Sequence, residues 1–147
     1  MGLGIVIKLS NQKYYVPLSS PKQSDYADAK KTIIRKSINP IVRMIKKENG
    51  SQRLLGTLKI GNMIPVPNKC VSNYDVNNEP DTFYKNLIID ELDFITRNYN
   101  QILTRANATY KQKVTGDTRF NYIEHCCDFK LLEQKCAEYE KSMEKSI

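Results

Sequence analysis

A short polar run, Ser19-Ser20-Pro21-Lys22, places two hydroxyl groups and an ammonium group within four residues. Such groups could act on a phosphodiester, because catalysis there needs proton transfer and a cation to offset the charge that grows on phosphorus. A serine is a weak base by itself, so Ser20 would need Lys22 or another cation beside it. The alternative interpretation is a plain turn with a solvated lysine, since Ser-Pro pairs commonly begin turns.

A second place where chemistry is conceivable is the sole histidine, His125, which is followed directly by Cys126. Sequence neighbours rarely form a nucleophilic Cys–His pair, because the base must approach through space with its own orienting group. The sequence contains no glycine-rich phosphate loop, no H-E-x-x-H motif and no paired metal-carboxylate motif. We therefore expect any catalysis to use neither a cofactor nor a metal ion.

Positive charge is concentrated in one half of the chain. The net charge is +7, and the first 79 residues hold thirteen Lys or Arg against five Asp or Glu. A one-sided basic field attracts polyanions such as nucleic acid, although a solvated face that aids solubility is the other interpretation. If the partner is RNA, the backbone contacts that we expect are Lys13, Lys30, Lys31, Arg35, Lys36, Arg43, Lys46 and Lys47.

Length and composition indicate one globular domain over residues 1–147. With 40% hydrophobic and 27% charged residues, the chain resembles ordinary globular proteins rather than disordered ones. No apolar run approaches the roughly 20 residues that span a bilayer, so we expect no membrane partner. The four cysteines, Cys70, Cys126, Cys127 and Cys136, lack the C-x-x-C spacing of zinc sites, and they favour a reducing, cytoplasmic location over a disulfide framework.

The elements that must position these groups are strands in the first half and helices in the second. Alternating and β-rich runs predict strands at 4–9, 13–18, 41–46, 54–60 and 63–66, with a long polar loop at 19–39. Asn49-Gly50 is among the strongest hairpin signals.

From Thr82 onward the pattern becomes helical. Asp81 is the expected N-cap of one long helix, which Thr115-Gly116-Asp117 ends. A last helix is predicted from Phe129 to Lys145. The expected inward residues are Tyr84, Ile88, Leu92, Ile95, Tyr99, Ile102 and Ala106 in the first helix, and Phe129, Leu132, Cys136 and Tyr139 in the last. These patterns predict an α+β fold.

The run from Lys13 to Lys22 resembles a signature of the ToxN/AbiQ family of type III toxin–antitoxin endoribonucleases, a G-I-V strand followed by K-Y-x-x-P-L-[TS]-S-P-K. Gly4-Ile5-Val6 stands in the place of the first part. Met63-Ile64-Pro65-Val66 resembles a further strand of the family, and the run from Asp128 to Lys135 resembles its last helix. The ordered set covers nearly the whole chain.

This resemblance implies a strongly twisted antiparallel sheet or barrel, similar to the MazF/Kid toxins, with helices packed on it and a mainly helical C-terminal half. It also implies sequence-specific, metal-independent RNA cleavage, in which a ribose 2′-OH attacks the adjacent phosphate and leaves a 2′,3′-cyclic end. The implied partners are substrate RNA and a repeat RNA that inhibits the toxin as a pseudoknot, in a ring-like protein–RNA assembly. The implied biological role is defence against phage.

By the same resemblance, Ser20 is the essential serine, Lys22 handles phosphate and Ser19 occupies the family's Thr/Ser position. Family members usually carry a further segment before the G-I-V strand, which has no counterpart here, so we expect one wall of the groove to be absent and cleavage to be weak. A non-catalytic RNA-binding module is the alternative function. A DNA-binding regulator is a weaker alternative, because no helix-turn-helix is evident.

Overall fold

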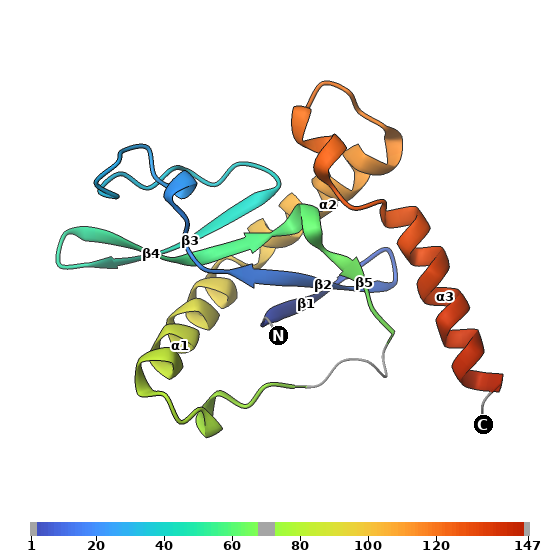
Figure 1. Cartoon of the computed structure of the whole chain (residues 1–147), viewed down its shortest axis with the longest axis horizontal. Coiled ribbons are helices and arrows are strands. Elements are labelled where there is room, and N and C mark those ends of the chain that lie inside the picture. The colour runs from blue at the N-terminus through green and yellow to red at the C-terminus, as the bar shows by residue number, and fades with distance from the viewer. Residues whose placement is uncertain (1–2, 68–72, 146–147) are drawn as a thin grey trace.

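The computed structural model describes residues 3–67 and 73–145, so Cys70 lies outside the described residues. The elements are β1 (Gly4–Leu9), β2 (Gln12–Ser19), β3 (Ile41–Glu48), β4 (Ser51–Lys59), β5 (Ile64–Pro65), α1 (Thr82–Arg97), α2 (Tyr99–Thr115) and α3 (Phe129–Lys145). Figure 1 shows a curled antiparallel sheet with helices packed against it and a helical C-terminal half. The predicted α+β fold class is confirmed.

Strand β2 is shared by both parts of the sheet. The order is β1-β2-β4-β3, and β5 also pairs with β2. The end of β2 pairs with β4, where Ser19 lies opposite Thr57, whereas its middle pairs with β5, where Tyr15 lies opposite Ile64. A short 3-10 helix, η2 (Ile60–Asn62), separates β4 from β5. The two strands therefore follow the same edge of β2 one after the other.

Two tight hairpins set the register of the strands. Ser10 and Asn11 join β1 to β2 with φ values of 48° and 65°, and Asn49 and Gly50 join β3 to β4 with φ values of 49° and 80°. Positive φ at both central residues is typical of the two-residue turns whose twist matches that of the strands. The hairpin predicted at Asn49-Gly50 is confirmed.

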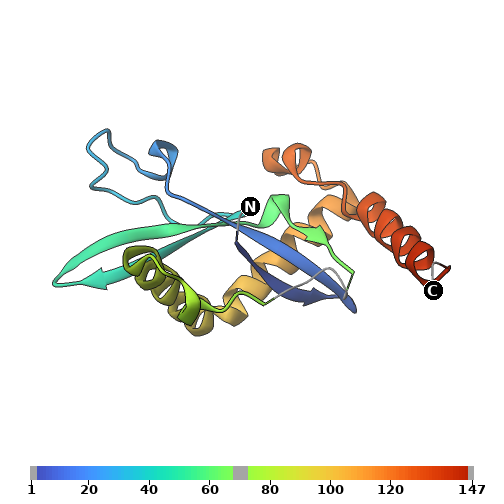
Figure 2. The same cartoon turned by 60° about the horizontal axis from the view of Figure 1, so that its bottom comes forward.

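The hydrophobic core lies between one face of the sheet and the helices α1 and α2. Figure 2 shows α1 and the start of α2 below the sheet and the loop of residues 20–40 above it. The residues that fill this core include Val16, Val42, Met44, Leu58, Ile95, Ile102 and Ala106. The opposite face of the sheet is thereby left to the polar loop, and this is the face that carries the candidate site.

The prediction of one long helix is wrong at Asn98, where α1 ends and α2 begins. Asn98 has φ −113° and ψ 19°, and its side-chain amide donates to the carbonyl of Phe94 at 2.8 Å. A short polar side chain that bonds to a nearby backbone carbonyl competes with regular helix. The two predicted ends are confirmed, since Asp81 accepts from the backbone N–H of Tyr84 and Gly116 closes α2 at φ 66°.

The predicted inward faces are correct in part. Ile88, Ile95, Ile102 and Ala106 are buried, as are Phe129 and Cys136 of α3. Leu132 is half-buried. The residues predicted inward but found exposed are Tyr84, Leu92, Tyr99 and Tyr139. A single helical period cannot stay on the sheet across the break at Asn98, and the end of α3 extends beyond the sheet (Figure 1).

Helix α3 is attached to the sheet by aromatic rings around one carboxylate. Tyr14 of β2 and Tyr110 of α2 both donate hydrogen bonds to Glu133, at 2.5 Å and 2.7 Å. Phe129 lies against both rings, with centroids 5.9 Å and 5.6 Å away.

Within residues 3–67 and 73–145, none of the helices combines the length and the apolar character that crossing a bilayer requires.

Candidate active site

The sheet face opposite the helices carries a row of three polar side chains across three strands. Ser19 of β2 is in register with Thr57 of β4, and Thr57 is in register with Arg43 of β3. Directly opposed residues in an antiparallel sheet project to the same side. Lys59 lies two residues beyond Thr57 on β4 and therefore faces the same way.

Thr57 is the centre of this row and is completely buried. Its hydroxyl oxygen has no hydrogen-bond partner within the described part of the chain. Leaving a buried hydroxyl without a partner costs about 1–3 kcal/mol, so most such groups are satisfied in native proteins. Thr57 therefore lies between Ser19 and Arg43, closed off from solvent.

An ion pair fixes the polar loop on this face. Arg43 donates from Nε to Asp25 Oδ1 at 3.0 Å, and both side chains are buried. Arg43 also donates from Nη1 to the carbonyl of Lys36 at 2.8 Å, and its backbone N–H donates to the Ser37 hydroxyl at 2.8 Å. One side chain on β3 thus holds both ends of the loop of residues 20–40.

The predicted catalytic run lies directly at this anchor. Asp25 ends the short helix η1 (Gln23–Asp25), and its Oδ2 accepts the backbone N–H of Lys22 at 2.8 Å. Ser19 is half-buried at the end of β2, whereas Ser20 and Lys22 are exposed beyond it. Ser20 and Lys22 therefore follow the row directly in the chain, and Lys22 lies close enough to Lys59 for the two charges to interact.

Lys59 belongs to the same group, and the sequence did not single it out. Burial lowers the pKa of Lys59, the nearby Asp25 carboxylate opposes this, and the positive charges of Lys22 and Arg43 lower it further. The four side chains are therefore electrostatic neighbours. Lys59 is two residues from Thr57 on one strand, a spacing that places both side chains on the same face. This spacing points to the site only once the pairing of β4 with β2 is known, and the sequence does not reveal that pairing.

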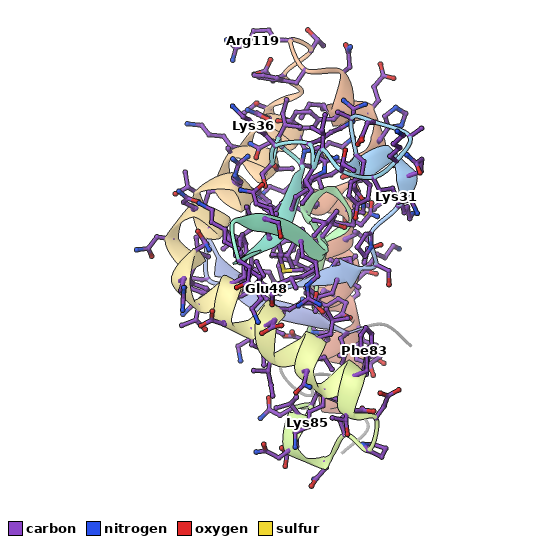
Figure 3. All side chains as sticks on the ribbon, turned by 90° about the vertical axis from the view of Figure 1, so that its left-hand side faces the viewer. Lys31, Lys36, Glu48, Phe83, Lys85 and Arg119 are labelled. Carbon is purple, nitrogen blue, oxygen red and sulfur yellow. The ribbon has the colours of Figure 1, made fainter. Side chains whose placement is uncertain are left out.

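The predicted RNA-binding residues fall into separate groups. Lys30, Lys31, Arg35 and Lys36 are exposed on the loop, which Asp28 stabilises by accepting the backbone N–H groups of Thr32 and Ile33 at 2.9 Å and 2.8 Å. In Figure 3, Lys31 and Lys36 lie on this loop, at the other end of the view from Phe83 and Lys85 of α1. We call these four exposed cations of the loop, Lys30, Lys31, Arg35 and Lys36, the loop cluster.

The remaining predicted contacts lie elsewhere. Lys46 is bound to Glu48 and Asp90 at 3.1 Å and 3.0 Å, beside the exposed Lys47 near the β3–β4 hairpin. Lys13 is exposed six residues before Ser19 on β2, which is roughly 20 Å along a strand. Arg43 is buried in its ion pair, a placement that favours a positioning role over the direct RNA contact that we predicted.

The side chains of His125 and Cys126 lie in different environments. His125 is exposed, whereas Cys126 is buried and its thiol lies 3.5 Å from the carbonyl of Tyr122. Burial raises the pKa of Cys126, the reverse of what a thiolate nucleophile needs. Among the described residues, no three His, Cys, Asp or Glu side chains are grouped so that they could hold a metal ion.

Comparison with known proteins gives one consistent result. A family model described as toxin ToxN of the type III toxin–antitoxin system matches residues 2–137. The endoribonuclease ToxN of Bacillus thuringiensis subsp. kurstaki is 29% identical over 146 residues, which cover 95% of this chain and 68% of that protein. The endoribonuclease ToxN of Pectobacterium atrosepticum is 29% identical, with 97% and 76% covered. The endoribonuclease AbiQ of Lactococcus lactis subsp. lactis is 27% identical, with 95% and 73% covered.

Two solved structures agree with these relatives. One is described as selective toxin inhibition by a non-coding RNA pseudoknot in bacterial type III toxin–antitoxin systems, and it has a TM-score of 0.70 at 27% identity. The other is described as a processed non-coding RNA that regulates a bacterial antiviral system, and it has a TM-score of 0.70 at 28% identity. Each comparison covers 93% of this chain and 77% of the other. With the family model matching most of its length, the chain belongs to the ToxN family of type III toxin–antitoxin toxins.

Proposed function

We propose that this chain is a single-domain toxin endoribonuclease that cuts RNA without a metal ion. The observation that carries the proposal is the end of β2, where the exposed Ser20 and Lys22 follow Ser19 and the charges of Lys22 and Lys59 lie close enough to act on each other. Hydroxyls beside cations suit internal transesterification, in which the nucleophile is already part of the substrate. The relatives described above are named endoribonucleases, which supports the same reaction for this chain.

In the proposed reaction, the ribose 2′-oxygen forms a bond to phosphorus while the bond from phosphorus to the 5′-oxygen breaks. Ser20 aligns the 2′-OH, whose proton leaves to solvent, and Lys22 stabilises the negative charge that grows on the phosphate oxygens. Lys59 protonates the departing 5′-oxygen, because partial burial makes its ammonium a stronger acid. The products are a 2′,3′-cyclic phosphate and a 5′-OH.

The loop cluster supports the proposal that RNA reaches this row from the outer face. Lys30, Lys31, Arg35 and Lys36 are exposed on the loop and can neutralise phosphates on either side of the cut. We infer that a folded repeat RNA of the same system occupies this face and blocks it, and that toxin and RNA units close into a ring-like assembly. The site of action would be the cytoplasm, and the role would be defence against phage.

The experiment that tests this function is RNA cleavage by the purified chain in excess EDTA. We expect cut products that carry 2′,3′-cyclic phosphates, identified by their resistance to a phosphatase until acid opens the ring. A requirement for magnesium would refute the mechanism. Tight RNA binding without any cleavage would instead favour the non-catalytic RNA-binding module, which the exposed loop cluster would also serve.

A further inference from the structure

A small pocket opens on the same sheet face, next to the polar row. Its volume is about 150 Å³, and its lining includes Pro40, Lys59, Asn62, Tyr122 and His125. This is smaller than the roughly 300–1,000 Å³ of pockets for drug-sized ligands, so only a ligand of about one ring system fits. Lys59 lines the pocket and is also an electrostatic neighbour of Lys22, so the pocket continues directly from the proposed catalytic groups.

The pocket is built from three segments that backbone hydrogen bonds hold together. The N–H of Ile60 donates to the carbonyl of Pro40 at 2.9 Å, and the N–H of Cys127 donates to the carbonyl of Gly61 at 2.9 Å. A Cβ atom on Gly61 would meet Pro40 and Cys126 at 3.2 Å and 3.3 Å, which is tight, so glycine lets these segments pack closely without a shift of either neighbour. The walls are therefore preformed rather than dependent on a ligand.

One wall of the pocket is the short helix η5 (Asn121–His125), which side chains of α2 hold in place. The Tyr122 hydroxyl donates to the side-chain carbonyl of Gln112, and Lys113 donates to the carbonyl of Ile123 at 3.0 Å. These contacts hold the Tyr122 ring in the lining while leaving the His125 imidazole exposed at the rim.

We propose that this pocket binds the nucleotide on the 3′ side of the cut, with its base against Tyr122, His125 and Pro40 and its phosphate facing Lys59. Unstacked RNA bases are commonly held on aromatic rings and read along their edges. The exposed Asn62 amide offers one donor and one acceptor, the pair that a base edge requires. Lys59, between pocket and row, then faces the 5′-oxygen of that same nucleotide. This inference rests on the proposed function.

The chain contains a single histidine, so the ring signals of His125 report on this pocket without ambiguity. The protein is prepared without a histidine tag, the cut site is mapped, and an RNA with a 2′-deoxy nucleotide at the cut is titrated in. We expect the His125 ring signals to shift with saturation. A shift without cleavage of the all-ribose RNA would refute the proposed catalysis and keep the pocket, whereas cleavage with a silent His125 would overturn the pocket alone.

Kinetics give the second readout. His125→Ala should raise KM roughly 5- to 100-fold with kcat nearly unchanged, which is the effect of losing one base-stacking contact. Asn62→Ala should weaken the base preference at the position directly 3′ of the cut. The matched control is Glu124→Ala, because Glu124 is the exposed neighbour of His125 and does not line the pocket. Equal KM values and base preferences for His125→Ala, Asn62→Ala and Glu124→Ala would overturn the proposal.

Discussion

The Arg43 guanidinium and the Asp25 carboxylate lie 3.0 Å apart beneath the turn that carries Lys22. Asp25 uses one oxygen for Arg43 and the other for the backbone N–H of Lys22. The position of a proposed catalytic residue at the end of β2 therefore depends on a side chain of β3. Both partners are buried, so neither charge can be satisfied by water if the other is removed.

We expect Asp25→Ala to cost about 3–5 kcal/mol of unfolding free energy, because it leaves the buried Arg43 unpaired. The double variant Asp25→Leu/Arg43→Met should regain much of this stability but not the cleavage activity, since the carboxylate that accepts the backbone N–H of Lys22 is gone. Urea unfolding and RNA cleavage together check this. The control is Asp93→Ala, whose partner Arg97 is exposed, with an expected cost below about 1 kcal/mol. Full activity in the double variant would show that the pair has no positioning role.

Ser20→Ala is expected to abolish RNA cleavage while RNA affinity and fold remain nearly unchanged. The hydroxyl is exposed at a turn, so its loss should cost within roughly 0.5 kcal/mol of stability. Removing one preorganised group from a transition state commonly costs about 100-fold or more in rate. Lys22→Ala should reduce both binding and cleavage, because it also removes charge. Gel mobility and cleavage of the same RNA separate the two effects, and cleavage by Ser20→Ala at the wild-type rate would leave Ser20 as a turn residue only.

Neutralising the loop cluster, Lys30, Lys31, Arg35 and Lys36, should weaken RNA binding and flatten its salt dependence. Each lost phosphate contact lowers the slope of log affinity against log salt by roughly one unit. The matched change is Lys46→Gln, which we expect to alter the slope little, because Glu48 and Asp90 already pair with that ammonium. An unchanged slope after the fourfold change would place the RNA path on another face.

Glu91 should make the fold less stable as pH rises from about 4.5 to about 7. It lies on α1 under the sheet, and burial raises its pKa from 4.5 to about 7. In this window the folded chain keeps a proton that the unfolded chain has released, so raising the pH favours unfolding. The loss by pH 8 should be about 3 kcal/mol, from the size of the shift. Urea unfolding at pH 5 and pH 8 should show most of this loss in wild type but not in Glu91→Gln.

The control for Glu91 is Glu138→Gln, an exposed carboxylate on α3 that should keep the wild-type pH dependence. If Glu91→Gln loses stability between pH 5 and pH 8 as wild type does, another group is responsible for the effect.

Features that a few adjacent residues determine could be predicted from the sequence. Asn49-Gly50 specifies its turn because both residues accept positive φ, and Asp81 caps α1 because its side chain reaches the N–H of Tyr84. The resemblance to a known family located Ser19, Ser20 and Lys22. Thr57 and Lys59 joined them only through the register of β2 with β4, two strands that are far apart in the sequence.

The break at Asn98 and the role of Arg43 also could not be predicted from the sequence. Asn98 ends α1 by donating its side-chain amide to the carbonyl of Phe94, but asparagine also occurs inside helices, so its residue type alone does not predict the break. Arg43 counts as one more basic residue in the sequence, and only its burial against Asp25, 18 positions away, gives it a different role.

The loop of residues 20–40 lies outside the core, on a sheet that the helices already support from the other side. Few anchors, chiefly Asp25, Arg43 and Ser37, connect it to that sheet. Its length and charge could therefore diverge between lineages with little penalty in folding, while a cognate RNA diverges in step. Two such systems in one cell would then not cross-react, because each toxin would bind the RNA of its own system and not the RNA of the other.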